Sequence, residues 1–564
     1  MKTPATAPQP QGIMGRIRAR IADSFRPRSE GVRYGAGCGS YRDSAYAGAS
    51  LTRKQLANWT PQRSPADVDL LPDYPMLVAR ARDLDRNNGV AAGCMQTVID
   101  NTVGVGLRLA CSPNYQMLGQ TIEWAQEWSR EVESLWRTWA GTTACDVTGK
   151  LTFNGLTQLV FRSCLENGEA LALPLWMERS GTPFRTCLQL VDTDRLSNPH
   201  FTPSSLKLRG GVEMDDYGKP TAYYIQRLLT TSGVLPLAFG PYGLMGNLAL
   251  NLMSEWERIP AETPFGRRRV LHIYQQDRVD QTRGKPVLTP VIEQFRLLDA
   301  YQRTELQTSI ANSLVAGVIE TPMDPASIYE MMGGDAASAA KYYENKSQAR
   351  IDVEGGTFFP IYPGDKLTPF TPTRPASQFG AFCETVLRQI GAALGLPYEL
   401  VLKDFSKTNY SSARAALNEA WRGFMNRRVW LATYWAQPVY QLWFEEAVNA
   451  GLIDAPDFYD NMPFYLDAKW IGPGRGVIDP VKEAEASQVR MDTMISTLEI
   501  ECAEQGLDYY DVLDQRKLEM DRMKELGLTP PEPLKPSAPR GETPGADPAE
   551  EPPPSQQQQQ KEAA

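Results

Sequence analysis

The chain has 564 residues, of which 42% are hydrophobic and 22% charged, and this composition excludes a wholly disordered or fibrous protein. Its length predicts roughly three or four domains rather than one core. Only two histidines occur, His200 and His272, which disfavours a histidine triad or a multi-histidine metal site. The eight cysteines form no Cys-x-x-Cys pair and are interpreted as buried thiols of a reducing compartment.

The net charge of −9 is distributed unevenly. Residues 1–65 hold eleven Lys and Arg against three Asp and Glu, whereas residues 529–564 hold three against six. The body between them is therefore acidic. A basic arm on an acidic body suggests a tethered contact with nucleic acid or an acidic partner, rather than a protein that coats DNA.

The first 65 residues are predicted to form a largely irregular arm. No signal peptide is expected, because Lys2 is followed by a sequence rich in Pro and Gln. Within the arm, Ile13, Ile17, Ile21 and Phe25 recur every four residues with arginines between them. We favour a segment that docks on another protein surface or stays mobile, and the alternatives are a membrane-surface helix and a transit peptide.

The next part of the chain is predicted to be helical at first and then rich in strands. Helices are expected at Ala79–Val103 and Gly119–Trp139, and the tryptophans of the second helix are expected in the core. Strands are expected at Val105–Ala110, Glu169–Trp176, Thr186–Val191 and Thr221–Arg227. The uncharged segment Thr230–Ser254 contains prolines and glycines, which favour a long apolar loop over a membrane-spanning helix.

From Gly284 onward the pattern is dominated by long helices. One is expected over Gly284–Gly317, and another is capped by Ser377 and ends at Gly395. After the polar segment Lys403–Tyr410, a third begins at Ser411 or Ser412 and bends or ends at Pro438. Asp479-Pro480 opens a helical block that reaches Leu526, and the residues after 528 form a disordered tail rich in Pro and Gln.

The motifs of common enzyme classes are missing or incomplete. There is no P-loop, Gly-x-Ser-x-Gly or His-Glu-x-x-His motif, and Gly104-x-Gly106 is only a weak sign of dinucleotide binding. Asp192 and Asp194 could present carboxylates to a metal, although a turn-capping role is favoured. The segment Gly472–Gly476 could wrap a phosphate, although a turn into the next helix is favoured. No catalytic, cofactor-binding or metal-binding residue is predicted.

Five stretches, taken in order, resemble the lambda-type portal proteins of tailed bacteriophages. The resemblance covers about residues 65–528, with an enlarged apolar loop and an unusually basic 403–409 segment as departures. Together they are specific, although no single one is decisive. The stretches are Asp83-Leu-Asp-Arg-Asn-Asn-Gly89, Arg195-Leu-Ser-Asn-Pro199, Asp280-Gln-Thr-Arg-Gly284, Tyr410–Trp421 and Trp470-Ile-Gly-Pro-Gly-Arg475.

The resemblance implies an α+β, portal-type fold in a ring oligomer. The wing would be residues 66–283, β-rich in part, together with residues 412–478, which would form a long helix and the segment that leads back from it. Stem helices at 284–319 and 377–396 would bracket a small α/β clip at 320–376. A tunnel loop would occupy 397–411 and a helical crown 479–528, between the arm at 1–65 and the tail at 529–564.

The resemblance also implies which residues face DNA. In the tunnel loop the candidates are Lys403, Lys407, Asn409 and Tyr410. In the stem, the candidates for lining the channel are Arg296, Arg303 and Arg388. No catalytic role is implied for any of them.

The implied function is that of a ring, commonly of twelve subunits, at one capsid vertex, assembled in the host bacterial cytoplasm. Its partners would be the large terminase motor, the head-tail connector, the major capsid and scaffold proteins and double-stranded DNA, with no membrane and no cofactor. The alternatives are a non-portal structural or adaptor ring of a virion, and an enzyme acting on nucleic acid or cell-wall polymer. A nuclease would require clustered carboxylates that bind metal.

Overall fold

The computed structural model describes residues 58–227, 255–314, 317–320, 366–369, 379–406, 408–476 and 479–528, with short stretches inside 49–56 and 327–344. The chain divides after Ser64 into two units, and the helices and strands given below belong to the second. Most of the expected arm, the apolar segment Thr230–Ser254, most of the expected clip, Ser377 and the expected tail lie outside the described residues.

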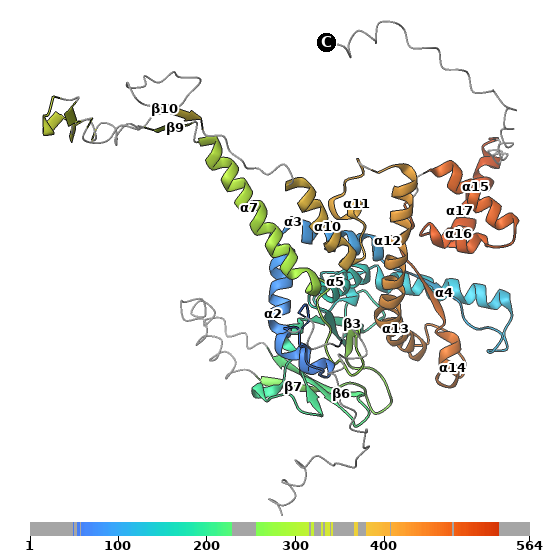
Figure 1. Ribbon diagram of the computed structural model, residues 1–564. Helices are drawn as coiled ribbons and strands as arrows, with labels where there is room; N and C mark the ends of the chain where they lie inside the picture. The colour runs from blue at the N-terminus through green and yellow to red at the C-terminus, as the bar shows by residue number, and fades with distance from the viewer. Residues whose placement is uncertain are drawn as a thin grey trace, which may run out of the picture. The chain divides into compact units, whose positions relative to one another are not determined.

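The helical region near residue 88 consists of two helices, so the single helix expected over Ala79–Val103 is wrong. Helix α2 covers Ala66–Asn87 and helix α3 covers Gly89–Thr102 (Figure 1). Between them Asn88 has an extended backbone, and its side chain accepts hydrogen bonds from the first amides of α3. An asparagine cap of this kind ends one helix and begins the next.

Two further helices pack around the aromatic core. Helix α4 covers Ile122–Ala140 and begins at Thr121, whose hydroxyl accepts a hydrogen bond from a backbone amide. Trp128, Trp136 and Trp139 are buried, which confirms the prediction that these tryptophans belong to the core. Helix α5, Phe153–Glu166, has no counterpart among the predicted elements.

The strands form small antiparallel sheets, and three of the predicted strands are confirmed. One sheet has the order β3-β2-β8 and another has the order β4-β5-β6-β7. The strands are β2 (Glu169–Trp176), β3 (Thr186–Val191), β4 (Leu208–Arg209), β5 (Val212–Met214), β6 (Pro220–Arg227), β7 (Glu255–Pro260) and β8 (Leu271–Tyr274).

A long helix follows the sheets, but it is shorter than Gly284–Gly317. A 3-10 turn at Thr289–Val291 comes first, and helix α7 covers Ile292–Leu314. Prolines at 286 and 290 favour this late start, because proline lacks the amide that a helix interior needs. Strands β9 (Gly317–Glu320) and β10 (Lys366–Pro369) pair with each other.

The second long helix, α10, covers Phe379–Leu394 and packs on α7, where Tyr301 contacts the rings of Phe379 and Phe382. Its C-terminal end agrees with the predicted end at Gly395, which has a positive φ of 71°. A short helix, α11 (Tyr398–Leu402), follows.

The third long helix starts close to the predicted position and is interrupted just before Pro438, where a bend or end was predicted. Helix α12 covers Tyr410–Leu431, a π-helical segment covers Ala432–Ala436, and helix α13 covers Gln437–Asn449. The proline sits in the first turn of α13, directly after the π-helical segment, where a missing amide costs little. Helix α14 (Phe458–Tyr465) leads to strand β11 (Ala468–Ile471), which pairs with β1 (Arg108–Cys111).

The predicted C-terminal helical block is confirmed. Helix α15 covers Pro480–Asp492, and its capping residue Asp479 accepts a hydrogen bond from the Lys482 amide. Helices α16 (Leu498–Glu504) and α17 (Tyr509–Glu525) follow.

A large apolar core joins α3, α4, α5, α10 and α13, and a smaller one lies between the two larger sheets. Among the described residues, no helix combines the length and the apolar character needed to cross a membrane.

Candidate functional site

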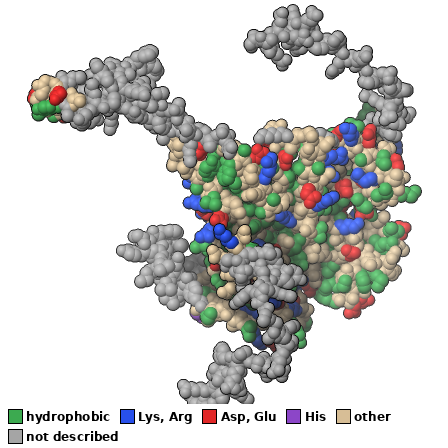
Figure 2. Space-filling model, in the orientation of Figure 1, with side chains coloured by type: hydrophobic (Ala, Val, Ile, Leu, Met, Phe, Trp, Pro, Cys, Tyr) green, Lys and Arg blue, Asp and Glu red, His purple; other side chains and the backbone are tan. Residues whose placement is uncertain are grey.

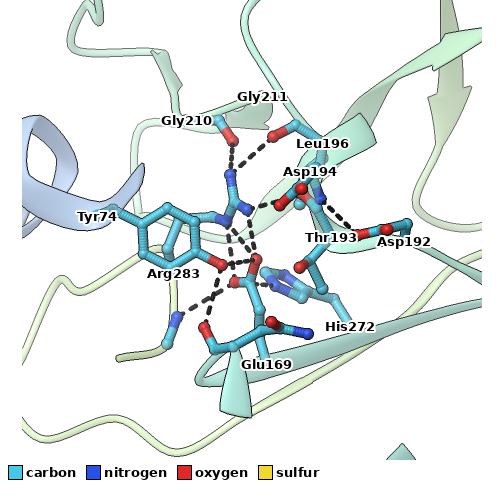
Figure 3. A network of polar contacts seen from close by, with 12 residues as sticks. Tyr74, Glu169, Asp192, Thr193, Asp194, Leu196, Gly210, Gly211, His272 and Arg283 are labelled. Atoms are coloured by element: carbon cyan, nitrogen blue, oxygen red, sulfur yellow. Dashed lines mark hydrogen bonds and ion pairs between the residues drawn. The ribbon is translucent and has the colours of Figure 1, made fainter. Parts of the chain in front are cut away.

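Arg283, from the motif Asp280–Gly284 that precedes α7 in the chain, lies at the centre of a buried polar network (Figure 3). The Nε of Arg283 donates to both carboxylate oxygens of Glu169, at 2.7 and 2.9 Å, and its Nη1 donates to the backbone carbonyls of Leu196 and Gly210, each at 2.8 Å. The guanidinium also lies over the ring of Tyr74, 4.6 Å from its centre. One arginine therefore joins α2, strand β2 and the loops beside β3 and β5.

Glu169 is the acidic partner of this network. Its side chain also accepts from the Tyr74 hydroxyl at 2.9 Å and lies 3.0 Å from Nε2 of His272. Burial works against ionisation of this carboxyl, but the neighbouring Arg283 and His272 outweigh burial and lower its pKa to about 2. The network therefore holds a buried carboxylate and a buried guanidinium in a fully hydrogen-bonded pair.

A second carboxylate anchors the same segment from α2. Asp67 accepts from the Thr282 amide at 2.9 Å and from the Thr282 hydroxyl at 3.1 Å, and it lies 3.3 Å from an Arg209 nitrogen. The peptide segment before α7 is consequently fixed to α2 and to β4. This anchoring fixes the position at which α7 begins relative to the sheets.

The two histidines belong to separate polar surroundings. His272 contacts Glu169 and the ring of Tyr274, whereas His200 has a positive φ of 51° and contacts the ring of Trp256. Within the described residues no group of three or more His, Cys, Asp or Glu side chains is placed to hold a metal ion.

Asp192 and Asp194 act as the turn prediction expects. The Asp192 carboxylate accepts from the Asp194 amide, and both carboxylates face Arg82, at 3.4 and 2.7 Å. Arginine thus occupies the position where a metal would have to lie.

The remaining motif residues also have structural roles. Asn88 caps α3, and the Asn198 side chain accepts from the Gly211 amide at 2.6 Å. In the Trp470–Arg475 motif, the Pro473 carbonyl accepts from Arg428 at 2.9 Å. Arg428 also donates to the last carbonyls of α3, at Asn101 and Thr102, so it ties α12 to the C-terminal end of that helix.

The three arginines proposed to line the stem are exposed and paired within their own helices. Arg303 lies 3.2 Å and Arg296 3.8 Å from the Asp299 carboxylate, and Arg388 lies 2.6 Å from Glu384. On the face shown in Figure 2, basic and acidic side chains are interspersed. The positive charge of these helices is therefore largely balanced locally.

The proposed tunnel loop, 397–411, contains the short helix α11, and only the turn between α11 and α12 is irregular. Lys403 ends α11 with a positive φ of 56°, and the Asn409 side chain accepts from the Ser412 amide at 2.8 Å, so Asn409 caps α12. Burial raises the pKa of the Cys94 thiol to about 11, and the charge of Lys403 acts in the opposite direction. Tyr410 is the first residue of α12, and Lys407 lies outside the described residues.

The sequence does not predict the network residues Tyr74 of α2 and Glu169 of β2, because Glu169 is recognisable there only as the first residue of a strand. One signal was available, since an acidic residue opens an otherwise apolar strand. A charge in that position requires a buried partner.

Comparison with known proteins decides the family. The family described as phage portal protein, lambda family, matches residues 52–428. The chain belongs to this portal family. Portal protein B of Escherichia phage lambda is 32% identical over 505 residues, covering 86% of this chain and 91% of that protein. The portal protein of Escherichia phage N15 is 32% identical over 496 residues, covering 85% and 90%.

Solved structures with a similar chain come from gene transfer agent particles. A chain from the neck of a native particle, solved with C12 symmetry, is 13% identical, with a TM-score of 0.38 over 70% of this chain and 94% of that chain. The portal family supplies structural components of the virion. A structural role agrees with the motif residues described above, most of which stabilise the fold through hydrogen bonds and ion pairs.

Proposed function

We propose that twelve copies of this portal-family chain form a ring at one capsid vertex, through which double-stranded DNA enters during packaging and leaves during ejection. The observation that carries the proposal is the match to lambda-family portal proteins over most of the chain. The ring would dock the large terminase motor and then the head-tail connector. It would be assembled in the host cytoplasm with major capsid and scaffold proteins, and it would perform no catalysis.

In this proposal helices α7 and α10 form the stem and β9 with β10 belongs to the clip. The sheets with α12 and α13 form the wing, and α15–α17 form the crown. The local pairing of Arg296, Arg303 and Arg388 supports a channel that does not grip DNA. Each free Lys or Arg that neutralises a phosphate adds salt-sensitive affinity, and sliding requires that affinity to be low.

A ring of this kind requires head-to-tail contacts that close after a fixed rotation. Purified protein should therefore appear in electron micrographs as rings with a central hole and sediment as a particle of several hundred kilodaltons or more. The same preparation should not hydrolyse DNA when magnesium is added. A stable monomer would contradict the ring, and magnesium-dependent cleavage would favour the nuclease alternative.

The tunnel segment gives a second test. Lys403 has a left-handed backbone conformation, which glycine adopts at lower cost than lysine. A lysine at such a position supports a functional role for its ammonium group. In a ring, Lys403 and Lys407 would repeat in every subunit and make weak phosphate contacts that exchange as DNA moves.

Replacing both Lys403 and Lys407 with alanine should leave ring assembly intact and alter DNA packaging, or DNA retention in filled heads, in a salt-dependent way. The matched control is Lys207→Ala, an exposed lysine that pairs with Asp216 on the sheet. Packaging and retention equal to wild type across a range of salt would show that these lysines do not contact DNA in the channel.

A further inference from the structure

The C-terminal block, defined as helices α15–α17, attaches to the rest of its unit mainly through charged groups. In Figure 1 these helices lie beside α4. Four ion pairs each join a basic residue of α4, β1 or β11 to an acidic residue of the block. They are Arg108–Asp511 at 3.1 Å, Arg130–Asp514 at 3.7 Å, Arg137–Asp511 at 3.7 Å and Lys469–Glu499 at 2.6 Å.

Apolar packing contributes little to this junction. Helices α15 and α17 have no buried residue, and no described residue of the C-terminal block belongs to either apolar core. Two cavities of about 530 and 780 Å³ lie between the block and the surfaces of α4, β1 and β11. Because little apolar area is buried there, small electrostatic changes can decide whether the block stays docked.

Glu133 of α4 lies between these two cavities and lines both. Its residue is 9% exposed, and its carboxylate accepts a hydrogen bond from the Cys111 amide at 2.8 Å. Asp508 also lines both cavities and caps α17 by accepting from the Tyr510 amide. Two carboxyl groups from opposite sides of the junction therefore line the same two cavities.

The neighbouring cations do not neutralise Glu133. Arg137 on its own helix and Arg108 on β1 both face Asp511, at 3.7 and 3.1 Å. In the described part of the chain no Lys or Arg lies within ion-pair distance of Glu133. From α13, the Tyr440 hydroxyl contacts the Cys111 thiol beside it. The other charged groups lining the first cavity are Arg428, Lys469, Arg475, Glu499 and Glu504.

We propose that Glu133 is a pH-sensitive latch between the C-terminal block and α4. When Glu133 is protonated, the first turn of α17 docks against it. When Glu133 is ionised, its charge repels Asp508 and Asp511 and loosens the junction.

The direction of the pH dependence follows from the surroundings of Glu133. Burial, with the charges of Asp508 and Asp511, raises its pKa from 4.5 to about 7 despite the Cys111 hydrogen bond and Arg137. Release of the block would expose this carboxyl to water and return its pKa toward 4.5. The docked state therefore binds more protons between these two values, so docking weakens as pH rises through that window and changes little above it.

The test is hydrogen exchange in the assembled full-length protein at about pH 5.5, 6.5 and 8, corrected for intrinsic exchange rates. Protection of the α16 and α17 amides should fall by about 30-fold across this range, since one titrating carboxyl changes an opening equilibrium by up to about tenfold per pH unit and about 1.5 units lie between pH 5.5 and its pKa. Glu133→Gln should keep the high protection at every pH. Glu133→Asp should restore a pH dependence.

The matched control is Glu131→Gln, an exposed carboxyl on the same helix, which should leave the wild-type profile unchanged. Wild-type protection that does not vary with pH would overturn the latch, and so would a Glu133→Gln profile with the wild-type slope. If Glu133→Gln does not fold, the wild-type profile decides, because a loss of protection confined to values above about pH 7 would also overturn the proposal.

Discussion

Replacing Arg283 with methionine should lower the free energy of unfolding by about 3–5 kcal/mol, because Glu169 would remain buried without its cationic partner. Both side chains are almost fully buried, at 4% and 0% exposed, so water cannot take over the lost contacts. Three backbone carbonyls, of Thr193, Leu196 and Gly210, would also lose a donor. Urea unfolding followed by tryptophan fluorescence measures the loss.

Two further variants separate this mechanism from a general packing defect. Pairing Arg283→Met with Glu169→Leu should recover part of the lost stability, because the unpaired charge is then removed. Arg422→Met, at an exposed arginine of α12, should change stability little. A single Arg283→Met variant as stable as wild type would show that the buried pair does not stabilise the fold.

The same pair predicts an acid dependence. The pKa of Glu169 is lowered from 4.5 to about 2 in the folded chain, so its stabilising contribution is present above about pH 4.5 and is lost as pH falls toward 2. Glu169→Gln should therefore remove part of the wild-type loss of stability in that window. An unchanged acid profile would mean that other carboxyl groups cause it.

Much of the helical layout could be predicted because its signals are local. The stripe of apolar residues in α10, the Asp479 cap and the buried tryptophans of α4 each depend on residues a few positions apart. The boundary at Asn88 was missed although its signal is also local, since Asn88 is a typical capping residue, has an extended backbone and is followed by Gly89.

The polar network could not be predicted, because its members are far apart in sequence. Tyr74, Glu169 and Arg283 meet only when α2, β2 and the segment before α7 come together. The motif Asp280–Gly284 was recognisable as a family feature, but nothing in it reveals that its arginine would be buried. For the exposed stem arginines and Lys403 the sequence suggested a role, but a single chain cannot test it, because that role depends on neighbouring subunits.

The close approach of two glycines gives the second prediction. A Cβ atom on Gly284 would overlap the backbone carbonyl of Gly168, and a Cβ on Gly168 would overlap the backbone of Lys285. Gly168 also has a positive φ of 89°, which side chains other than glycine rarely adopt. Backbone atoms on both sides of the contact cannot move aside as a flexible side chain can.

Gly284→Ala should therefore separate β2 from the segment before α7 and cost about 3 kcal/mol or more, in line with overpacking of a rigid site. Gly423→Ala is the matched control, because Gly423 lies in α12 and a Cβ there meets no atom within 4 Å. That variant should instead be stabilised by about 0.5–1 kcal/mol through the better helix propensity of alanine. Soluble Gly284→Ala protein that unfolds at the wild-type urea concentration would show that the contact relaxes. Equal destabilisation by both variants would show that the clash with Gly168 does not set the cost.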